Sequence, residues 1–328
     1  MAPPGLRVGL IGNGTVGAAF ASALDANHER LSQRLGVRVQ LVQIAVRTPD
    51  RHRDVLPGVR VHDDAESLAN DGGIDVVVEA SGDLAASQWL RRVIARGAAA
   101  VSANKLAIAS DRALLDALAR RHPLLHCEGA VAAALPIVRA LRDSLDGEEI
   151  HDLRGVLNGT TTFILTQLER GACFDDAVAA AQEAGYAESD TSTDLSGRDA
   201  AAKLAILATL AWRRPVTLDE VATRGIDGNI VDVVRVACDH GSRVRLVAEA
   251  WEEDGLQLRV APKLLDAADP LARAEDVINV VAVQSALAGP LTWYGAGAGG
   301  TRTASALLGD VLAASRALVG THTGRIAA

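Results

Sequence analysis

Two ionisable side chains stand four residues apart in a segment rich in Ala and Leu. If that segment is a helix, Asp199 and Lys203 share one face, and an acidic loop with Glu188 and Asp194 precedes them. A lysine can take a proton from an alcohol, or return one to a carbonyl, provided that burial lowers its pKa towards neutrality. The carboxylates could hold the ammonium group of an amino-acid substrate. A solvated surface pair, and a magnesium or calcium loop, are the alternatives.

A second lysine, Lys105, follows an apolar segment at residues 99–102 that is predicted to be a strand. The carboxyl ends of parallel strands are where α/β proteins bind their ligands. Lys105 is therefore a candidate for the same reaction, with a surface lysine at a strand end as the alternative.

A glycine motif of the form G-x-G-x-x-G lies between a predicted strand and a predicted helix. It comprises Gly12, Asn13, Gly14, Thr15, Val16 and Gly17. The first glycine allows a tight turn, the second lets the backbone approach a pyrophosphate, and the third lets helix and strand pack closely. The N–H groups that begin the helix then face the phosphates. The motif predicts dinucleotide binding, and a turn without a ligand is the alternative.

The end of the second predicted strand should distinguish NADP from NAD. A carboxylate there would bind the ribose hydroxyls, but the sequence has Arg47, with Arg51 and Arg53 close behind. Guanidinium groups bind a 2′-phosphate through charge-assisted contacts. NADP is therefore the favoured cofactor, although Asp50 or Asp54 could still serve the ribose of NAD.

Strands and helices alternate in the first part of the chain. Strands are expected at 6–11, 37–46, 74–79, 99–102 and 124–127, and helices at 18–35, 84–96 and 107–121. Apolar strands that alternate with helices predict an α/β fold, a Rossmann-type doubly wound parallel sheet.

The pattern changes after Pro136. Strands are expected at 147–156, 242–251, 256–260 and 276–285, and helices at 161–170, 174–184, 199–212 and 303–318, with a glycine-rich turn at 295–300. We expect a dinucleotide-binding domain at 1–134, with a C-terminal helix at 301–328 packing back on it. An α+β catalytic and dimerisation domain would occupy 135–300.

Length and composition agree with two domains. The chain has 328 residues, 49% of them hydrophobic, and a net charge of −8. Such acidity disfavours nucleic acid and anionic membranes as partners. The sequence contains no apolar run of about 18 residues, so no membrane-spanning helix is predicted. Three cysteines without paired spacing indicate a reducing compartment, hence the cytoplasm.

Four segments in order along the chain resemble homoserine dehydrogenases. They are Ser102–Lys105, Asn158–Leu165, Gly185–Leu207 and Gly295–Ser305. The resemblance covers nearly the whole chain. It implies NAD(P)-dependent interconversion of L-homoserine and L-aspartate 4-semialdehyde, a step of threonine and methionine biosynthesis, by a homodimer.

The resemblance also implies roles for individual residues. It places Lys203 and Lys105 at the substrate hydroxyl and Glu188 at the substrate amino group, with support from Asp194 and Asp199. It further assigns Gly159, Thr160 and Tyr186 to the substrate, and Ser81, Lys105 and Gly297 to the cofactor. A monovalent cation such as Na⁺ would be held by Glu128, Val131, Ala133 and Leu135, although a hinge between domains is an equal alternative there.

The sequence departs from the family pattern at several positions. Ser189 and Thr191 replace prolines, so the acidic loop should be less rigid. Thr162 stands where the family has Asn. Ala132 and Ala134 replace glycines and would be strained if the backbone has positive φ. We expect a short form of the family, without an ACT or aspartokinase domain.

Three other functions remain open on sequence alone. The enzyme could act on another small amino or hydroxy acid, because the acidic loop is altered. It could be a phosphorylating aldehyde dehydrogenase with Cys127 as nucleophile. It could also be a non-catalytic NADP-binding sensor, although the lysines and carboxylates would then have no use.

Overall fold

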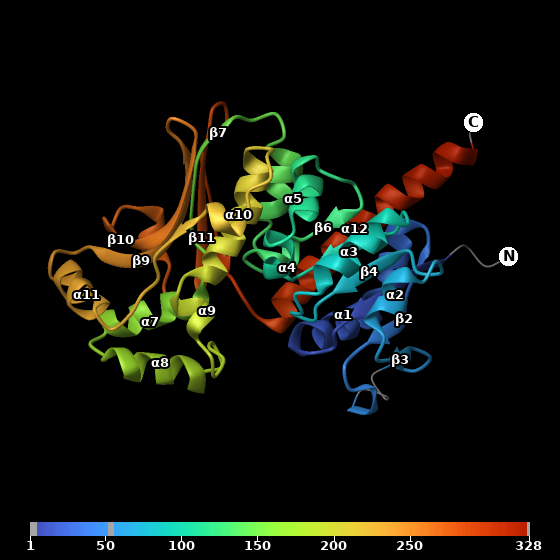
Figure 1. Ribbon diagram of the computed structural model, residues 1–328, viewed down its shortest axis with the longest axis horizontal. Helices are drawn as coiled ribbons and strands as arrows, with labels where there is room; N and C mark the ends of the chain where they lie inside the picture. Colours follow the sequence, from blue (N-terminus) through green and yellow to red (C-terminus); the bar gives the residue numbers. More distant parts are fainter. Residues whose placement is uncertain (1–4, 52–55, 327–328) are drawn as a thin grey trace. The chain divides into compact units, whose positions relative to one another are not determined.

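The computed structural model describes residues 5–51 and 56–326, with side chains described to residue 318 (Figure 1). The chain forms two compact units. The first comprises residues 1–134 together with 299–328, and the second comprises residues 135–298.

A six-stranded parallel sheet forms the centre of the first unit, in the order β3-β2-β1-β4-β5-β6. Its strands are β1 (Gly5–Ile11), β2 (Arg38–Ala45), β3 (Arg60–His62), β4 (Val76–Glu79), β5 (Ala99–Ser102) and β6 (Leu125–His126). The order runs outwards in both directions from β1 and β4. Ligands of doubly wound folds bind beside the carboxyl ends of the strands at this switch point.

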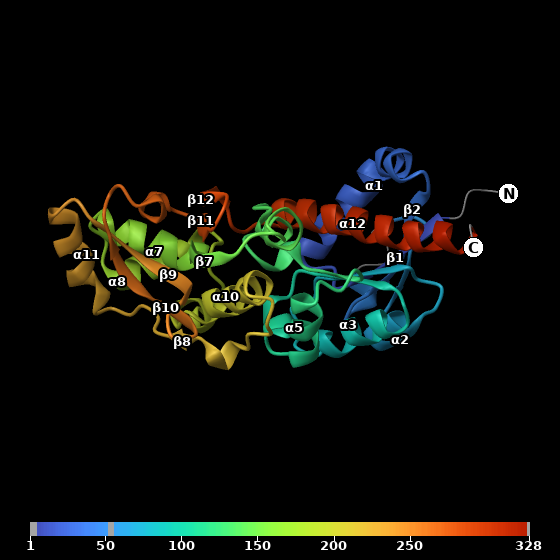
Figure 2. The ribbon, with the colours of Figure 1, turned by 90° about the horizontal axis from the view of Figure 1, so that it is seen from above.

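Helices cover both faces of this sheet (Figure 2). One face carries α1 (Thr15–Leu35) and α12 (Gly300–Ile326), and the other carries α2 (Ala65–Asn70), α3 (Ala86–Ala95) and α5 (Arg112–Ala119). Because both faces are covered, the strands are almost continuously apolar. The core joins β-strand residues to Phe20 of α1 and to Leu307 of α12, all buried.

The helix expected at 107–121 is two helices, α4 (Lys105–Ala109) and α5. The break has a local cause: the side chain of Asp111 accepts a hydrogen bond from the backbone N–H of Leu114 and so caps a new helix. The short strand β3 and helix α2 were not expected.

A second six-stranded sheet, in the order β12-β11-β7-β9-β10-β8, forms the centre of the second unit. Its strands are β7 (Ile150–Val156), β8 (Ala222–Thr223), β9 (Arg243–Glu252), β10 (Leu256–Leu265), β11 (Ile278–Ser285) and β12 (Gly289–Ala296). All pairs are antiparallel except β8 with β10. Helices α7 (Gly159–Glu169), α10 (Arg198–Ala211) and α11 (Ile230–Asp239) pack against β9, and α8 (Phe174–Glu183) packs on α7.

Arg245, in β9, is the largest fully buried side chain among the described residues. Its guanidinium donates to Oε1 of Glu169 at 2.5 Å and to the carbonyl oxygens of Ala274 and Val244 at 2.5 and 2.7 Å. This charge pair joins the end of α7 to the sheet.

Short elements complete the chain. They are η1 (Pro49–Arg51), η2 (Glu128–Ala130), α6 (Ile137–Arg139), η3 (Ala140–Ser144), α9 (Ser192–Leu195), η4 (Leu218–Glu220) and η5 (Pro270–Arg273). Across the described residues, no helix has both the length and the apolar character needed to cross a membrane. The predicted fold class, a doubly wound parallel sheet with an α+β partner, is confirmed.

Candidate active site

Lys203 of the second unit is a buried amine with two acceptors. Its side chain lies in α10, and Nζ donates to Oδ2 of Asp199 and to the carbonyl oxygen of Leu157, each at 2.7 Å. Lys203 is 8% exposed and Asp199 is 5% exposed. The pair therefore differs from an ordinary surface i, i+4 pair, because taking both charges out of water requires close partners.

Asn158 connects this pair to the acidic loop. Its Nδ2 donates to Oδ1 of Asp194 at 2.7 Å and to Oδ2 of Asp199 at 2.9 Å, while its Oδ1 accepts from the backbone N–H of Thr161 at 2.8 Å. Asn158 is thus both the N-cap of α7 and a bridge between two candidate carboxylates.

The remaining candidate substrate residues border this group. The hydroxyl of Thr160 donates to the carbonyl oxygen of Tyr186 at 2.8 Å, and the Tyr186 ring lies 5.1 Å from that of Phe163. Gly159 begins α7 beside Val277. Glu188 is exposed, and its carboxylate makes no hydrogen bond or ion pair within the described parts of the chain. It is therefore available to a ligand.

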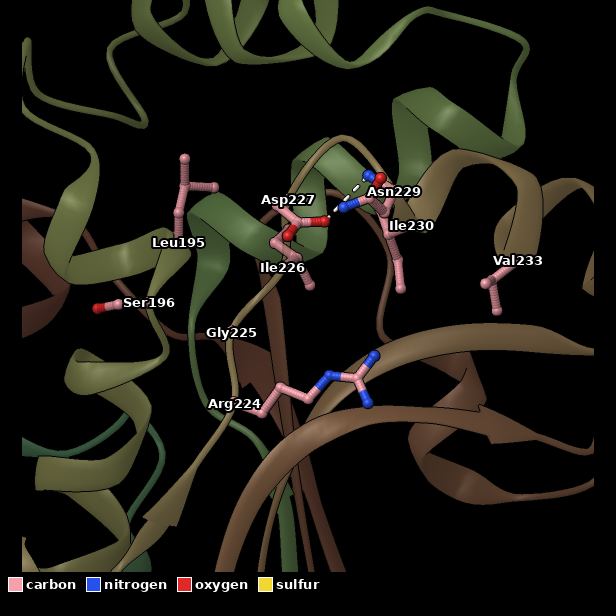
Figure 3. A pocket seen from close by; sticks show the side chains of 9 residues that line it. All are labelled: Leu195, Ser196, Arg224, Gly225, Ile226, Asp227, Asn229, Ile230 and Val233. Atoms are coloured by element: carbon pink, nitrogen blue, oxygen red, sulfur yellow. Dashed lines mark hydrogen bonds between the residues drawn. The ribbon is translucent and has the colours of Figure 1, made fainter.

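A separate pocket lies between the α9–α10 junction and residues 224–233 (Figure 3). Gly225 makes its wall possible, because a Cβ there would come within 1.8 Å of the carbonyl oxygen of Leu195. The Arg224 side chain extends towards Ile230 in this view. Neither Lys203 nor its acceptors line the pocket, so it is distinct from the lysine group.

The glycine loop of the first unit has the geometry that its motif requires. Gly12 has φ of +88°, and a Cβ there would lie 2.5 Å from Cα of Ser81. A Cβ on Gly17 would lie 2.0 Å from the carbonyl oxygen of Gly12, whereas one on Gly14 would meet no atom within 4 Å. The first and third glycines thus allow close packing, and the second leaves open space.

Open space at Gly14 lies where α1 begins. Gly14 is the N-cap of α1, and no described side chain caps the helix there. Asn13 is buried beside it, while Thr15 and Val16 begin α1. Uncapped N–H groups at the positive end of a long helix are suited to a phosphate.

Ser81 and Lys105 stand at the carboxyl edge of the same sheet. Ser81 follows β4, and Lys105 is the first residue of α4, directly after β5. Lys105 is half-buried. The structure therefore places two further candidate cofactor residues beside the switch point.

The basic turn after β2 is only partly described. Arg47 is exposed just beyond the end of β2, and Arg51 is exposed at the end of η1. Arg53 and Asp54 lie outside the described residues.

The candidate cation segment has a strained backbone. Glu128 is 2% exposed, and its N–H donates to Oδ2 of Asp310 at 2.8 Å. Ala132 and Ala133 have φ of 53° and 46°, in the left-handed region, but Ala134 does not. The condition for strain, a positive φ, is therefore met at Ala132 but not at Ala134, and it is also met at Ala133.

The members of this segment belong to different units. Val131 and Ala133 are buried and lie in the first unit, whereas Leu135 begins the second. Within the described residues, no group of three or more His, Cys, Asp or Glu side chains is arranged to hold a metal. Any cation would therefore depend on backbone carbonyls beside Glu128.

Gly297 leaves room for a buried amide. A Cβ there would lie 2.0 Å from Cγ of Asn279, whose side chain is 1% exposed. Neither polar atom of that amide has a hydrogen-bond partner among the described residues. The glycine turn is therefore shaped by Asn279, a residue that the sequence analysis did not single out.

Comparison with known families accounts for both units. The family model for homoserine dehydrogenase matches residues 136–312, and the model for the NAD-binding domain of homoserine dehydrogenase matches residues 12–128. The chain belongs to the homoserine dehydrogenase family. It is accordingly an NAD(P)-dependent oxidoreductase of L-homoserine, as the resemblance implied.

Relatives and solved structures agree with this assignment. The homoserine dehydrogenase of Corynebacterium glutamicum is 37% identical over 98% of the chain and 74% of the relative, and that of Helicobacter pylori is 36% identical over 95% and 74%. The chain thus spans about three quarters of these homoserine dehydrogenases. A crystal structure of the Thiobacillus denitrificans enzyme superposes with a TM-score of 0.89, at 34% identity over 97% of this chain and 75% of that one. A hyperthermophilic archaeal homoserine dehydrogenase in complex with NADPH has a TM-score of 0.80, at 26% identity over 95% and 98%.

Proposed function

We propose that Lys203 is the acid/base group of the homoserine dehydrogenase reaction. The supporting observation is its burial against Asp199 and the Leu157 carbonyl, which fixes the amine in one place. A dinucleotide held by the glycine loop of residues 12–17 would supply the acceptor for the hydride of the carbinol carbon. Lys203 takes the hydroxyl proton as the carbonyl forms, and in the reverse direction it returns that proton to the carbonyl oxygen.

The composition of the chain supports a role for lysine. Of its 33 basic Lys and Arg residues only three are lysines, at positions 105, 203 and 263, and two of these are candidate site residues. A guanidinium does not lose its proton near neutral pH, whereas an ammonium can. An arginine at position 105 or 203 could not take part in this proton transfer.

The acidic residues around Lys203 receive separate roles in this proposal. Glu188, exposed and without a side-chain partner in the described structure, binds the substrate ammonium. Asp194 and Asp199 are joined by Asn158 and hold Lys203 in place. Gly159, Thr160 and Tyr186 shape the substrate side of this group.

The cofactor side is proposed to be the glycine loop of the first unit. Gly12 to Gly17 would receive the pyrophosphate, with Ser81 and Lys105 along the same edge of the sheet, and Gly297 near the nicotinamide. Lys105 would also assist at the substrate hydroxyl. NADP is preferred over NAD because Arg47, at the end of β2, can bind a 2′-phosphate.

Three further features complete the proposal. Glu128, with the carbonyls of Val131, Ala133 and Leu135, would bind a monovalent cation such as Na⁺. The strand-rich second unit would form a homodimer. The free cysteines suit the cytoplasm.

A spectrophotometric assay tests the role of Lys203. Homoserine is supplied with NADP and then NAD, and absorbance is followed at about 340 nm for the wild type, Lys203→Ala and Lys263→Ala. Lys263 is the matched control because it also pairs with a carboxylate, that of Glu249, but in β10. We expect Lys203→Ala to lose about 10²–10⁴-fold in kcat and Lys263→Ala to keep wild-type turnover. An active Lys203→Ala enzyme would refute the acid/base assignment.

A further inference from the structure

Glu79 is a buried carboxyl group that the proposed chemistry does not use. It is the last residue of β4, directly opposite Ser102, the last residue of β5, and its exposure is 0%. A carboxyl group is almost never buried so completely without partners. Its partners therefore indicate what it is there to hold.

One carboxyl oxygen of Glu79 holds the loop after β4. Oε1 accepts from the backbone N–H of Ser81 at 2.8 Å and from its hydroxyl at 2.7 Å. The Ser81 hydroxyl in turn accepts from the N–H of Asp83 at 3.1 Å. This loop also packs against Gly12 of the glycine motif.

The other oxygen holds the loop after β5. Oε2 accepts from the hydroxyl of Ser102 at 2.7 Å, and that hydroxyl accepts from the N–H of Asn104 at 3.0 Å. Asn104 is the N-cap of α4, so it fixes the point at which Lys105 begins the helix.

A further hydrogen bond joins the loop after β4 directly to the loop after β5, and it completes a ring of hydrogen-bonded residues. Nδ2 of Asn104 donates to the carbonyl oxygen of Asp83 at 2.8 Å. The members of this hydrogen-bond ring are Glu79, Ser81, Asp83, Asn104 and Ser102. Every bond in it joins groups at the carboxyl edge of the sheet, beside the switch point between β1 and β4.

We propose that Glu79 is a positioning residue for the cofactor, which locks the loops after β4 and β5 into one rigid edge against which the dinucleotide binds. A preformed edge spares the entropy that two independent loops would lose on binding. This inference rests on the proposed function, because the cofactor assignment of the edge comes from there.

Direct cofactor binding tests this inference without requiring turnover. NADPH affinity is measured by fluorescence titration for the wild type, Glu79→Gln, Glu79→Met and Val78→Ala. Methionine keeps the length of the side chain but accepts none of the three hydrogen bonds. Glutamine keeps an acceptor for Ser81 and can donate to Ser102. Val78, fully buried in the same strand, controls for loss of packing.

We expect Glu79→Met to raise the NADPH Kd at least tenfold, Glu79→Gln to stay within about threefold of the wild type, and Val78→Ala to leave the Kd unchanged. In steady-state assays the KM for cofactor should rise while the KM for homoserine does not. Should Glu79→Met fail to fold, Ser102→Ala removes one link of the ring and should raise the Kd several-fold.

The other outcomes overturn the inference in distinguishable ways. Unchanged NADPH affinity in Glu79→Met or Ser102→Ala would show that the ring does not position the cofactor. Equal losses in Glu79→Met and Val78→Ala would show a general packing effect. A wild type that binds neither NADPH nor NADH would overturn the cofactor assignment itself and this inference with it.

Discussion

Nζ of Lys203 lies 2.7 Å from Oδ2 of Asp199, one helical turn earlier in α10. The same oxygen also accepts from Asn158, which places one amide between the Lys203–Asp199 pair and the acidic loop. The position of the lysine therefore depends on a residue that belongs to another helix.

Two substitutions of Asn158 should separate its effect on stability from its effect on substrate binding. Asn158→Ala removes both the cap of α7 and the bridge, so it should lose about 1 kcal/mol of stability and also raise the KM for homoserine. Asn158→Ser keeps a capping oxygen but loses the bridging donor. We expect it to have nearly wild-type stability in urea unfolding with an impaired KM. A normal KM in the serine variant would argue against the bridging role.

Arg47 should determine the choice of cofactor. Arg47→Ala removes a charge-assisted contact to a 2′-phosphate, and the KM for NADP should rise about 10–100-fold while that for NAD changes little. Arg38, exposed at the opposite end of β2, is the control and should affect neither. Equal weakening of both cofactors by Arg47→Ala would contradict the assignment.

Replacing an alanine of left-handed backbone conformation by glycine should relieve backbone strain. Ala133 and Ala130 are both 3% exposed, but only Ala133 has positive φ. Each glycine variant loses the same buried methyl group, and only Ala133→Gly relieves the backbone. Ala133→Gly should therefore be more stable than Ala130→Gly by about 1–2 kcal/mol. Equal unfolding free energies would mean that the segment relaxes around the alanine.

Removing one partner of the buried Glu169–Arg245 ion pair should strongly lower the free energy of unfolding. Glu169→Ala leaves the guanidinium of a fully buried arginine without its carboxylate, and the free energy of unfolding should fall by about 3–5 kcal/mol. The double variant Glu169→Leu with Arg245→Met should recover most of that loss. Chemical denaturation measures both, and a double variant no better than the single one would count against this account.

Glu79 predicts a pH dependence of stability. Burial raises the pKa of its carboxyl above the ordinary value of 4.5, although hydrogen bonds from Ser81 and Ser102 oppose that shift. The folded protein thus holds the proton more tightly than the unfolded chain, and stability falls as pH rises from about 4.5 through the folded pKa. Glu79→Gln lacks this loss, so its stability relative to the wild type should increase with pH. A constant difference in unfolding free energy from pH 4.5 to 8 would show that the carboxyl titrates normally.

Local patterns in the sequence were sufficient for the elements with strong signals. The apolar strands and the helix after the glycine motif were predicted within a few residues, because burial on both faces leaves an uninterrupted apolar run. In contrast, β12 was missed, because its outward positions are exposed and it contains Gly289 and Pro290. Helix α11 was missed as well, although its alternating apolar face gives a helical signal.

The site was predictable in its residue types but not in its connections. Asp199 and Lys203 follow from helical spacing, whereas the third partner, the Leu157 carbonyl, comes from a distant segment and carries no sequence signal. Asn158 did carry a sequence signal, since Asn before a helix start is typical of an N-cap. Glu79 also carried a sequence signal, because a carboxyl group that ends an apolar strand must find partners inside the protein.

The place of α12 has a consequence for synthesis on the ribosome. Ala304, Leu307, Val311 and Ala314 contribute to the core around β1, which the ribosome makes some 300 residues earlier. The sheet of the first unit therefore keeps one apolar face uncovered until α12 is made and packs on it. Exposed apolar surface of this kind favours aggregation, so chaperones would be needed during that interval.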